Sequence, residues 1–117
     1  MKLKPFLHDG VYIFADVPDG AIPTDAVAMF REREGATIVL PEDAATRLGL
    51  RPLFRAAWVE LSQDTGLGDL GITAAFSRVL ADAGISCNVF AANHHDHIFV
   101  PFDRGADAVK LLEKIDI

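Results

Sequence analysis

The segment Thr37-Ile38-Val39-Leu40-Pro41-Glu42-Asp43 is followed later in the chain by a segment with a similar pattern of residue types, His97-Ile98-Phe99-Val100-Pro101-Phe102-Asp103. Each begins with an apolar run typical of a buried strand and continues with a proline and an early acid typical of a helix start. The offset is 60 residues without a gap, and Phe30 and Phe90 share it. The pattern predicts an internal repeat that divides the chain into two similar halves.

The first half shows signals for strands but few for helices. Residues 11–17 read as a strand, and residues 26–32 and 36–40 read as a hairpin joined through Gly35. A short helix is predicted from Pro41, with acids in its first turn and Gly49 at its end. The first half therefore reads as βββα, one helix short of a βαββα unit.

The second half contains the clearest helix. Its apolar stripe consists of Ile72, Ala75, Phe76, Val79, Leu80 and Ala83. Asp69 is expected to cap this helix and Gly84 to end it. Residues 54–61, 85–91 and 97–101 read as strands, and Asp103 is expected to cap a last helix. This half reads as βαββα and lacks a final strand.

The fold predicted from these elements is an α+β sandwich, with an antiparallel sheet carrying helices on one face. The predicted units are residues 1–53, which lack the first helix, and residues 54–117. The strand from Phe54 is expected to close the first unit and open the second. The N-terminus, with Lys2 and Lys4, is expected to be frayed.

Charge and length limit the classes of partner. The chain has 117 residues and a formal net charge of −6, from 17 acidic and 11 basic residues. A chain this acidic repels phosphate groups, so nucleic acid and anionic membrane surfaces are unlikely partners. No window approaches the ~20 apolar residues of a membrane-spanning helix.

Cysteine usage and the N-terminus point to the cytoplasm. Cys87 is the single cysteine, which excludes an internal disulfide and a Cys₄ zinc site. The N-terminus has no long apolar run before Asp9, so no signal peptide is expected. Cys87 alternates with Val89 in an apolar strand, which favours a buried, inert thiol over a nucleophile.

The loop before the clearest helix is the candidate ligand site. A Gly-rich loop at a helix start leaves backbone N–H groups free, and these could hold a carboxylate. Asp64 or Asp69 could meet an ammonium group, and Gly71 would allow close approach. The alternative is structural: Asp69 caps the helix while Gly66 and Gly68 shape the turn.

The histidine-rich segment Asn93-His94-His95-Asp96-His97 suggests a metal site. Strand alternation, however, puts His95 and His97 on one face and His94 and Asp96 on the other. Since His8 is remote in sequence and no further ligand set has zinc spacing, the favoured reading is a hairpin whose imidazoles form hydrogen bonds. No metal and no cofactor are expected.

Three strings of the second half resemble the ACT domain, a regulatory module with βαββαβ ferredoxin-like topology. They are Trp58-Val59-Glu60-Leu61, Asp69-Leu70-Gly71-Ile72-Thr73-Ala74-Ala75-Phe76 and Leu80-Ala81-Asp82-Ala83-Gly84-Ile85-Ser86-Cys87-Asn88-Val89. The resemblance implies ferredoxin-like tandem repeats with a regulatory role. A small ligand is expected between the helix start at Asp69 and a neighbouring unit.

A closer resemblance is to small bacterial tandem-ACT proteins that look related to the CASTOR arginine sensors. It rests on Phe30-Arg31-Glu32-Arg33-Glu34-Gly35-Ala36-Thr37-Ile38-Val39, on Ile85-Ser86-Cys87-Asn88-Val89 and on His95-Asp96-His97-Ile98-Phe99-Val100-Pro101. It covers residues 12–112 and implies sensing of a small molecule, in particular an amino acid.

The function predicted from the sequence is a regulatory ligand-binding protein without catalysis. The predicted ligand-binding residues are Ser62, Asp64, Gly68, Asp69, Leu70, Gly71 and Asn88. A homodimer or higher homo-oligomer is expected, because a missing strand and a missing helix would leave sheet edge and apolar surface to cover. Two alternatives stay open: a metal-binding protein or metal-dependent enzyme using residues 94–97, and a structural dimer without a ligand.

Overall fold

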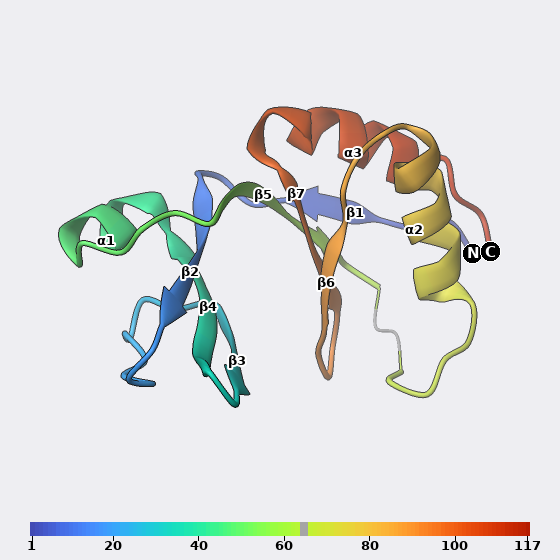
Figure 1. Ribbon diagram of the computed structural model, residues 1–117. Helices are drawn as coiled ribbons and strands as arrows, with labels where there is room; N and C mark the ends of the chain where they lie inside the picture. Colours follow the sequence, from blue (N-terminus) through green and yellow to red (C-terminus); the bar gives the residue numbers. More distant parts are fainter. Residues whose placement is uncertain (64–65) are drawn as a thin grey trace. The chain divides into compact units, whose positions relative to one another are not determined.

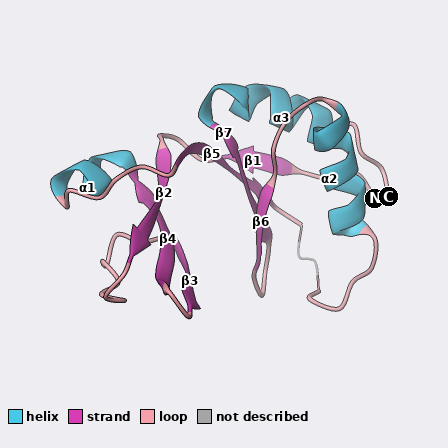
Figure 2. Cartoon of the chain, viewed as in Figure 1, coloured by secondary structure: helices cyan, strands magenta, loops and turns pink. Residues whose placement is uncertain are grey.

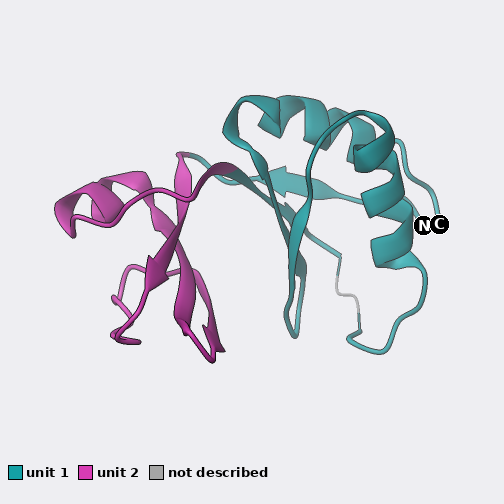
Figure 3. Cartoon of the chain, viewed as in Figure 1, with its two compact units in different colours: residues 1–9, 57–117 teal, residues 10–56 magenta. Residues whose placement is uncertain are grey.

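The computed structural model describes residues 1–63 and 66–117. The chain forms two compact units, shown in different colours in Figure 3. Unit 1 consists of residues 1–9 and 57–117, and unit 2 consists of residues 10–56. Each unit has its own hydrophobic core, as two halves of a repeat require.

Unit 2 is a small antiparallel sheet with one short helix. Its elements are β2 (Tyr12–Val17), β3 (Ala28–Glu32), β4 (Gly35–Pro41), α1 (Glu42–Arg47) and the beginning of β5 (Phe54–Leu61). The strand order is β3-β4-β2-β5, and each neighbouring pair in this order is antiparallel. Residues 18–27 form no helix, so the elements of unit 2 before β5 are three strands and one short helix (Figures 1 and 2).

The core of unit 2 follows from strand alternation. Ile13, Ala15 and Ile38 are fully buried, and Ala44 and Ala45 of α1 pack against them. α1 ends in a left-handed turn at Gly49, whose φ of +68° suits glycine. The N–H of Leu50, the residue after this turn, donates to the Ala45 carbonyl at 2.9 Å.

Unit 1 is a complete ferredoxin-like arrangement. Its elements are β1 (Pro5–Leu7), the later part of β5, α2 (Ile72–Asp82), β6 (Asn88–Ala91), β7 (Asp96–Pro101), a 3₁₀ turn (Phe102–Arg104) and α3 (Gly105–Glu113). The strand order is β1-β5-β7-β6 (Figure 1). Ile72, Phe76 and Leu80 of the predicted apolar stripe are buried in its core.

The N-terminal segment is a strand and not a frayed end, which corrects the sequence prediction. β1 pairs antiparallel with β5, with Pro5 opposite Leu61 and Leu7 opposite Val59. The Leu3 N–H donates to the Ile115 carbonyl at 3.1 Å, and Leu3 is only 3% exposed. β1 therefore supplies the strand that residues 54–117 lack.

Strand β5 belongs to both units. Phe54, Arg55 and Ala56 pair with β2, and unit 1 begins at Ala57. The strand thus closes the sheet of unit 2 and continues into unit 1. The boundary lies three residues beyond the one predicted at 53/54, and residues 1–9 pack with the second half because β1 pairs there.

The repeat around the two prolines is visible in the backbone. Pro41 ends β4 before α1, and Pro101 ends β7 before the 3₁₀ turn. Their ψ angles, 144° and 139°, are both extended. α3 begins only at Gly105 and has no side-chain cap, so the prediction that Asp103 caps it is wrong. Among the described helices, none is long and apolar enough to cross a membrane.

Gly105 provides a test of the packing between β1, β5 and α3. A Cβ at this position would lie 2.9 Å from the Ala57 Cβ and 3.3 Å from a Leu7 methyl group. Ala57 is fixed on a strand and cannot yield cheaply, so Gly105→Ala should lower the free energy of unfolding by about 1–2 kcal/mol even after the gain in helix propensity. Urea unfolding measures the change.

Gly68→Ala is the matched control, because a Cβ at Gly68 would meet no atom within 4 Å. Its expected effect is within about 0.5 kcal/mol of zero. Equal effects of the two variants would contradict close packing at Gly105.

Candidate functional site

The predicted ligand loop lies on the surface of unit 1 between β5 and α2. Ser62, Gly68, Asp69 and Gly71 are exposed, and the Leu70 side chain is 93% exposed. The Ser62 N–H donates to the Lys4 carbonyl at 2.8 Å, so this amide is already used by the pairing of β1 and β5. Asp64, a predicted ammonium contact, lies outside the described residues.

Asp69 does not cap α2, contrary to the sequence prediction. Its Oδ2 accepts the Gly66 N–H at 2.8 Å, and its own N–H donates to the Gly66 carbonyl at 3.0 Å. These two bonds close a turn ahead of the helix. The carboxylate finds a nearer backbone donor than the helix amides, which explains why a normally reliable cap signal fails here.

α2 begins at Ile72, and Gly71 occupies the capping position with a φ of +89°. No side chain caps this end of the helix. The first N–H groups of a helix have no partner within it, so the start of α2 retains donors for a carboxylate. A side chain at Gly71 would be strained by the positive φ, and its Cβ would meet no atom within 4 Å.

A small hollow of about 60 Å³ lies beside the start of α2. It is lined by Gly66, Leu67, Asp69, Ile72, Thr73, Ala91 and Asp96. The structure thus brings Asp69 together with the helix start. Asn88, another predicted site residue, lies on β6, where its Nδ2 donates to the Phe99 carbonyl at 3.4 Å, and it does not line this hollow.

Asp96 is a second acidic residue of this hollow, and it was not among the predicted ligand-binding residues. Its side chain is 8% exposed. It begins β7 and shares the helix-facing side with buried Ile98 and Val100. A positively charged group in the hollow could form a charge-assisted hydrogen bond with this carboxylate.

The histidines gather instead on the opposite side of the sheet of unit 1. His97 Nδ1 accepts the Trp58 indole N–H at 3.0 Å, and His8 stacks on the Trp58 ring with centroids 3.6 Å apart. His8 Nε2 lies 3.0 Å from Oε1 of Glu60. His95 and His97 share this face, as alternation predicts, while His94 is exposed.

His8 and Glu60 were not recognised as neighbours from the sequence. The register of β1 with β5 places Phe6 opposite Glu60, and the His8 N–H donates to the Trp58 carbonyl at 2.9 Å. Only this pairing brings His8 next to Glu60, and no spacing in the sequence reveals it.

The described residues include no group of three or more His, Cys, Asp or Glu side chains with a geometry that could hold a metal ion. The Trp58 N–H already occupies Nδ1 of His97. Partial burial raises the pKa of the Cys87 thiol. A raised pKa keeps the thiol protonated, as expected for an inert residue packed against the core of unit 1.

Comparison with known families matches both halves of the chain. The ACT domain matches residues 1–57 and, through a second sequence profile, residues 56–114. The chain belongs to the ACT-domain family. ACT domains are regulatory ligand-binding modules and not catalytic ones. The two matches meet near residue 56, where β5 passes from unit 2 to unit 1.

Solved structures give the same picture of a tandem ACT fold. A Vibrio cholerae protein of unknown function, described as a possible transport protein, is 36% identical with a TM-score of 0.82, over 95% of this chain and 88% of that one. An Agrobacterium tumefaciens protein is 23% identical with a TM-score of 0.70, over 96% and 87%. The aspartokinase alpha and beta subunits share the fold at 12% identity and a TM-score of 0.62, over 97% and 96%. No curated protein matches the chain.

The partial burial of His97 predicts a pH dependence of stability. Burial lowers the pKa of His97 below its usual 6.5; Glu60 and Asp96 oppose this, while His95 and His8 add to it. The unfolded chain therefore takes up this proton at a higher pH than the folded chain. The free energy of unfolding should fall as the pH falls through 6.5 towards the lowered value, and this contribution is constant below it.

His97→Asn should flatten this decrease, because asparagine does not titrate and its amide oxygen can still accept the Trp58 N–H. His94→Asn, at an exposed position, should leave the decrease in place. Urea unfolding at neutral pH and at about pH 5.5 measures both. An unchanged slope in His97→Asn would refute the assignment.

Proposed function

We propose that this chain is a cytoplasmic regulatory protein that binds an amino acid in unit 1 and catalyses no reaction. The observation that carries the proposal is the buried carboxylate of Asp96 beside the start of α2. Membership of the ACT family supports the regulatory role. The single thiol, in a chain without partners for a disulfide, supports the cytoplasmic location.

The two charges of an amino acid match the two ends of this hollow. The ammonium group would lie against Asp96, and the α-carboxylate would accept hydrogen bonds from the free amides of Ile72 and Thr73. Asp69 also lines the hollow, but it is exposed, so water would screen an ion pair with Asp69 more than one with the buried Asp96. Gly68, Leu70 and Gly71, also predicted as ligand residues, are exposed neighbours of this hollow in sequence and do not line it.

The size of the hollow makes the site suitable for regulation. About 60 Å³ accommodates an ammonium group but not a whole amino acid. Gly66, Leu67 and Asp69, which line the hollow on this side, must therefore shift as the ligand enters. A ligand that binds the shifted arrangement more tightly changes the balance between two states, which is how a binding module transmits a signal.

Asp96→Asn tests the proposal. A thermal-shift screen of the common amino acids should reveal a compound that stabilises the unaltered chain by ~2.7 kcal/mol at a hundred times its dissociation constant. In a domain of this size that is a rise in Tm of several degrees. Asp96→Asn keeps the size of the side chain but removes its charge, so it should abolish the rise.

Asp43→Asn is the matched control, because Asp43 lies on α1 in unit 2, outside the hollow. It should keep the full shift. Absence of any stabilising amino acid, or an undiminished shift in Asp96→Asn, would overturn the proposal and leave a structural role for the chain.

We also propose that the chain is a homodimer. The sequence predicted a dimer partly from an open sheet edge in the second half. Because β1 pairs with that edge of β5, the proposal must rest on another observation. Leu67 and Leu70 provide them, since their side chains are 71% and 93% exposed on one loop of unit 1. Paired exposed leucines favour self-association.

Light scattering at micromolar concentration should give the mass of two chains. Leu70→Ser should shift the population towards the monomer, whereas Leu53→Ser should not, although Leu53 is also half exposed. A monomer in the unaltered chain would contradict the dimer.

A further inference from the structure

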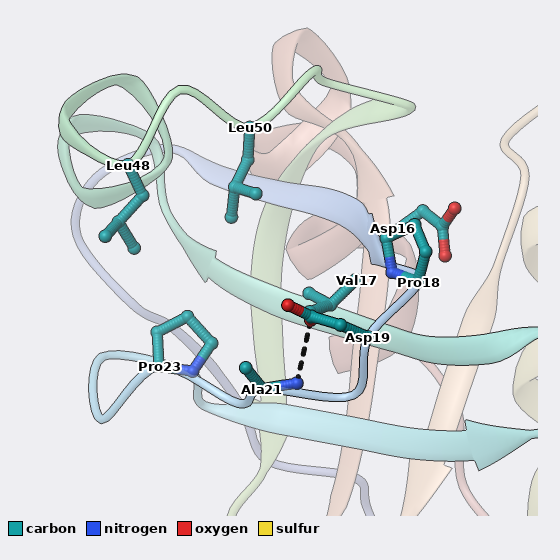
Figure 4. A pocket seen from close by; sticks show the side chains of 8 residues that line it. All are labelled: Asp16, Val17, Pro18, Asp19, Ala21, Pro23, Leu48 and Leu50. Carbon is teal, nitrogen blue, oxygen red and sulfur yellow. Dashed lines mark hydrogen bonds between the residues drawn. The ribbon is translucent and has the colours of Figure 1, made fainter.

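Unit 2 contains a much larger hollow than the one beside Asp96. Its volume is about 530 Å³, and it lies between the loop that follows β2 and the turn that follows α1 (Figure 4). Sites for small molecules usually have volumes of roughly 300–1,000 Å³. The hollow is therefore large enough for a complete small ligand.

The hollow exists because unit 2 lacks the helix that α2 provides in unit 1. α2 places large side chains such as Phe76 and Leu80 over its sheet. The loop of residues 18–27 offers only Ile22 and Ala26, both partly buried. These smaller groups fill less volume, and the space beyond the end of β2 stays open.

A partner helix does not fit as the occupant. The sheet beneath the missing helix is already covered, since Ile13, Ala15 and Ile38 are fully buried in this chain alone. The open space lies only at the end of β2, next to Val17 and Leu50. It is bounded by a loop and a turn, as a small-molecule site is.

The lining combines an apolar wall with acidic groups. The wall consists of Val17, Pro18, Ala21, Pro23, Leu48 and Leu50. Asp19 extends into the hollow from the loop, while Asp16 lies at its rim (Figure 4). No basic side chain is among the described residues that line it. The net charge of −6 adds to an electrostatic preference for cations.

The exposed Asp19 side chain forms one local hydrogen bond. Its Oδ1 accepts the Ala21 N–H at 3.0 Å, drawn as a dashed line in Figure 4. This bond favours one orientation of the carboxylate, which reduces the ordering required when a cationic donor approaches its other oxygen.

We propose that this hollow binds a small organic amine, whose ammonium group pairs with Asp19 and whose apolar body packs against Leu48, Leu50 and Pro23. The carboxylate of Asp19 repels negative charge, so an anionic ligand of the same shape is rejected. This site is separate from the one beside Asp96 and does not require an amino acid, because nothing in the lining is arranged to hold a second, negative charge.

Titration of the full chain with benzylamine, followed by ¹H–¹⁵N NMR, tests the site. Benzylamine should shift the amide signals of residues 16–21 and 48–50. Benzyl alcohol, of similar shape without the charge, should bind about tenfold more weakly, and benzoate should cause no shift. Equal binding of the amine and the alcohol, or no shift with benzylamine, would overturn the proposal.

Asp19→Asn is the decisive variant, because its amide oxygen can still accept the Ala21 N–H while the charge is lost. It should weaken benzylamine binding about tenfold or more, and Asp16→Asn should weaken it less. Asp43→Asn, outside the hollow, should bind normally. Concentration-dependent shifts at residues 16–21 without any amine would show a second copy of the chain in the hollow and would also overturn the proposal.

The two sites can fail independently. Asp96→Asn should leave benzylamine binding intact, and Asp19→Asn should leave the amino-acid thermal shift intact. Loss of both responses in either variant would indicate general disruption of the fold, and circular dichroism of each variant detects that case. If a variant loses its binding response only because it is unfolded, the loss is not an effect of the removed charge, and the corresponding proposal is refuted.

Discussion

The pairing of β1 with β5 is the interaction on which unit 1 depends. Without β1, one side of β5 would carry unpaired N–H and C=O groups beside a hydrophobic core. With it, Leu7 reaches α3 at Gly105, and His8 reaches Trp58 and Glu60 on the other face. A strand of three residues therefore supports both the helical layer and the imidazole cluster.

Features set by neighbouring residues were predictable from the sequence. β5 was predicted with its observed bounds, because a largely apolar run lies between Pro52 and the polar loop that begins at Ser62. The stripe of α2 identified Ile72, Phe76 and Leu80 as core. The repeat at Pro41 and Pro101 was predictable because each proline follows an apolar run. The predicted helix start at Pro41 was one residue early, since each proline ends its strand and the helical turn begins at the next residue.

Features set by distant residues were not predictable. β1 is too short to show a periodic pattern, and its partner lies more than fifty residues away in the sequence. Asp69 shows the limit of a local signal, since the same carboxylate can cap a helix or close a turn, and geometry decides between them. Asp96 was predicted as part of a hydrogen-bonded hairpin, but its burial beside α2 follows from tertiary packing.

The ends of the chain lie side by side in unit 1. The Leu3 N–H donates to the Ile115 carbonyl, and the backbones of Lys2 and Asp116 form an isolated antiparallel β-bridge. Read from β5, the elements of this unit follow the order strand, helix, strand, strand, helix, and then β1. A short peptide linking residue 117 to residue 1, combined with a new opening at the exposed turn between Asp9 and Gly10, would give a circular permutant. In that permutant each unit would occupy one uninterrupted stretch of chain, with residues 10–56 first and the whole of unit 1 after them.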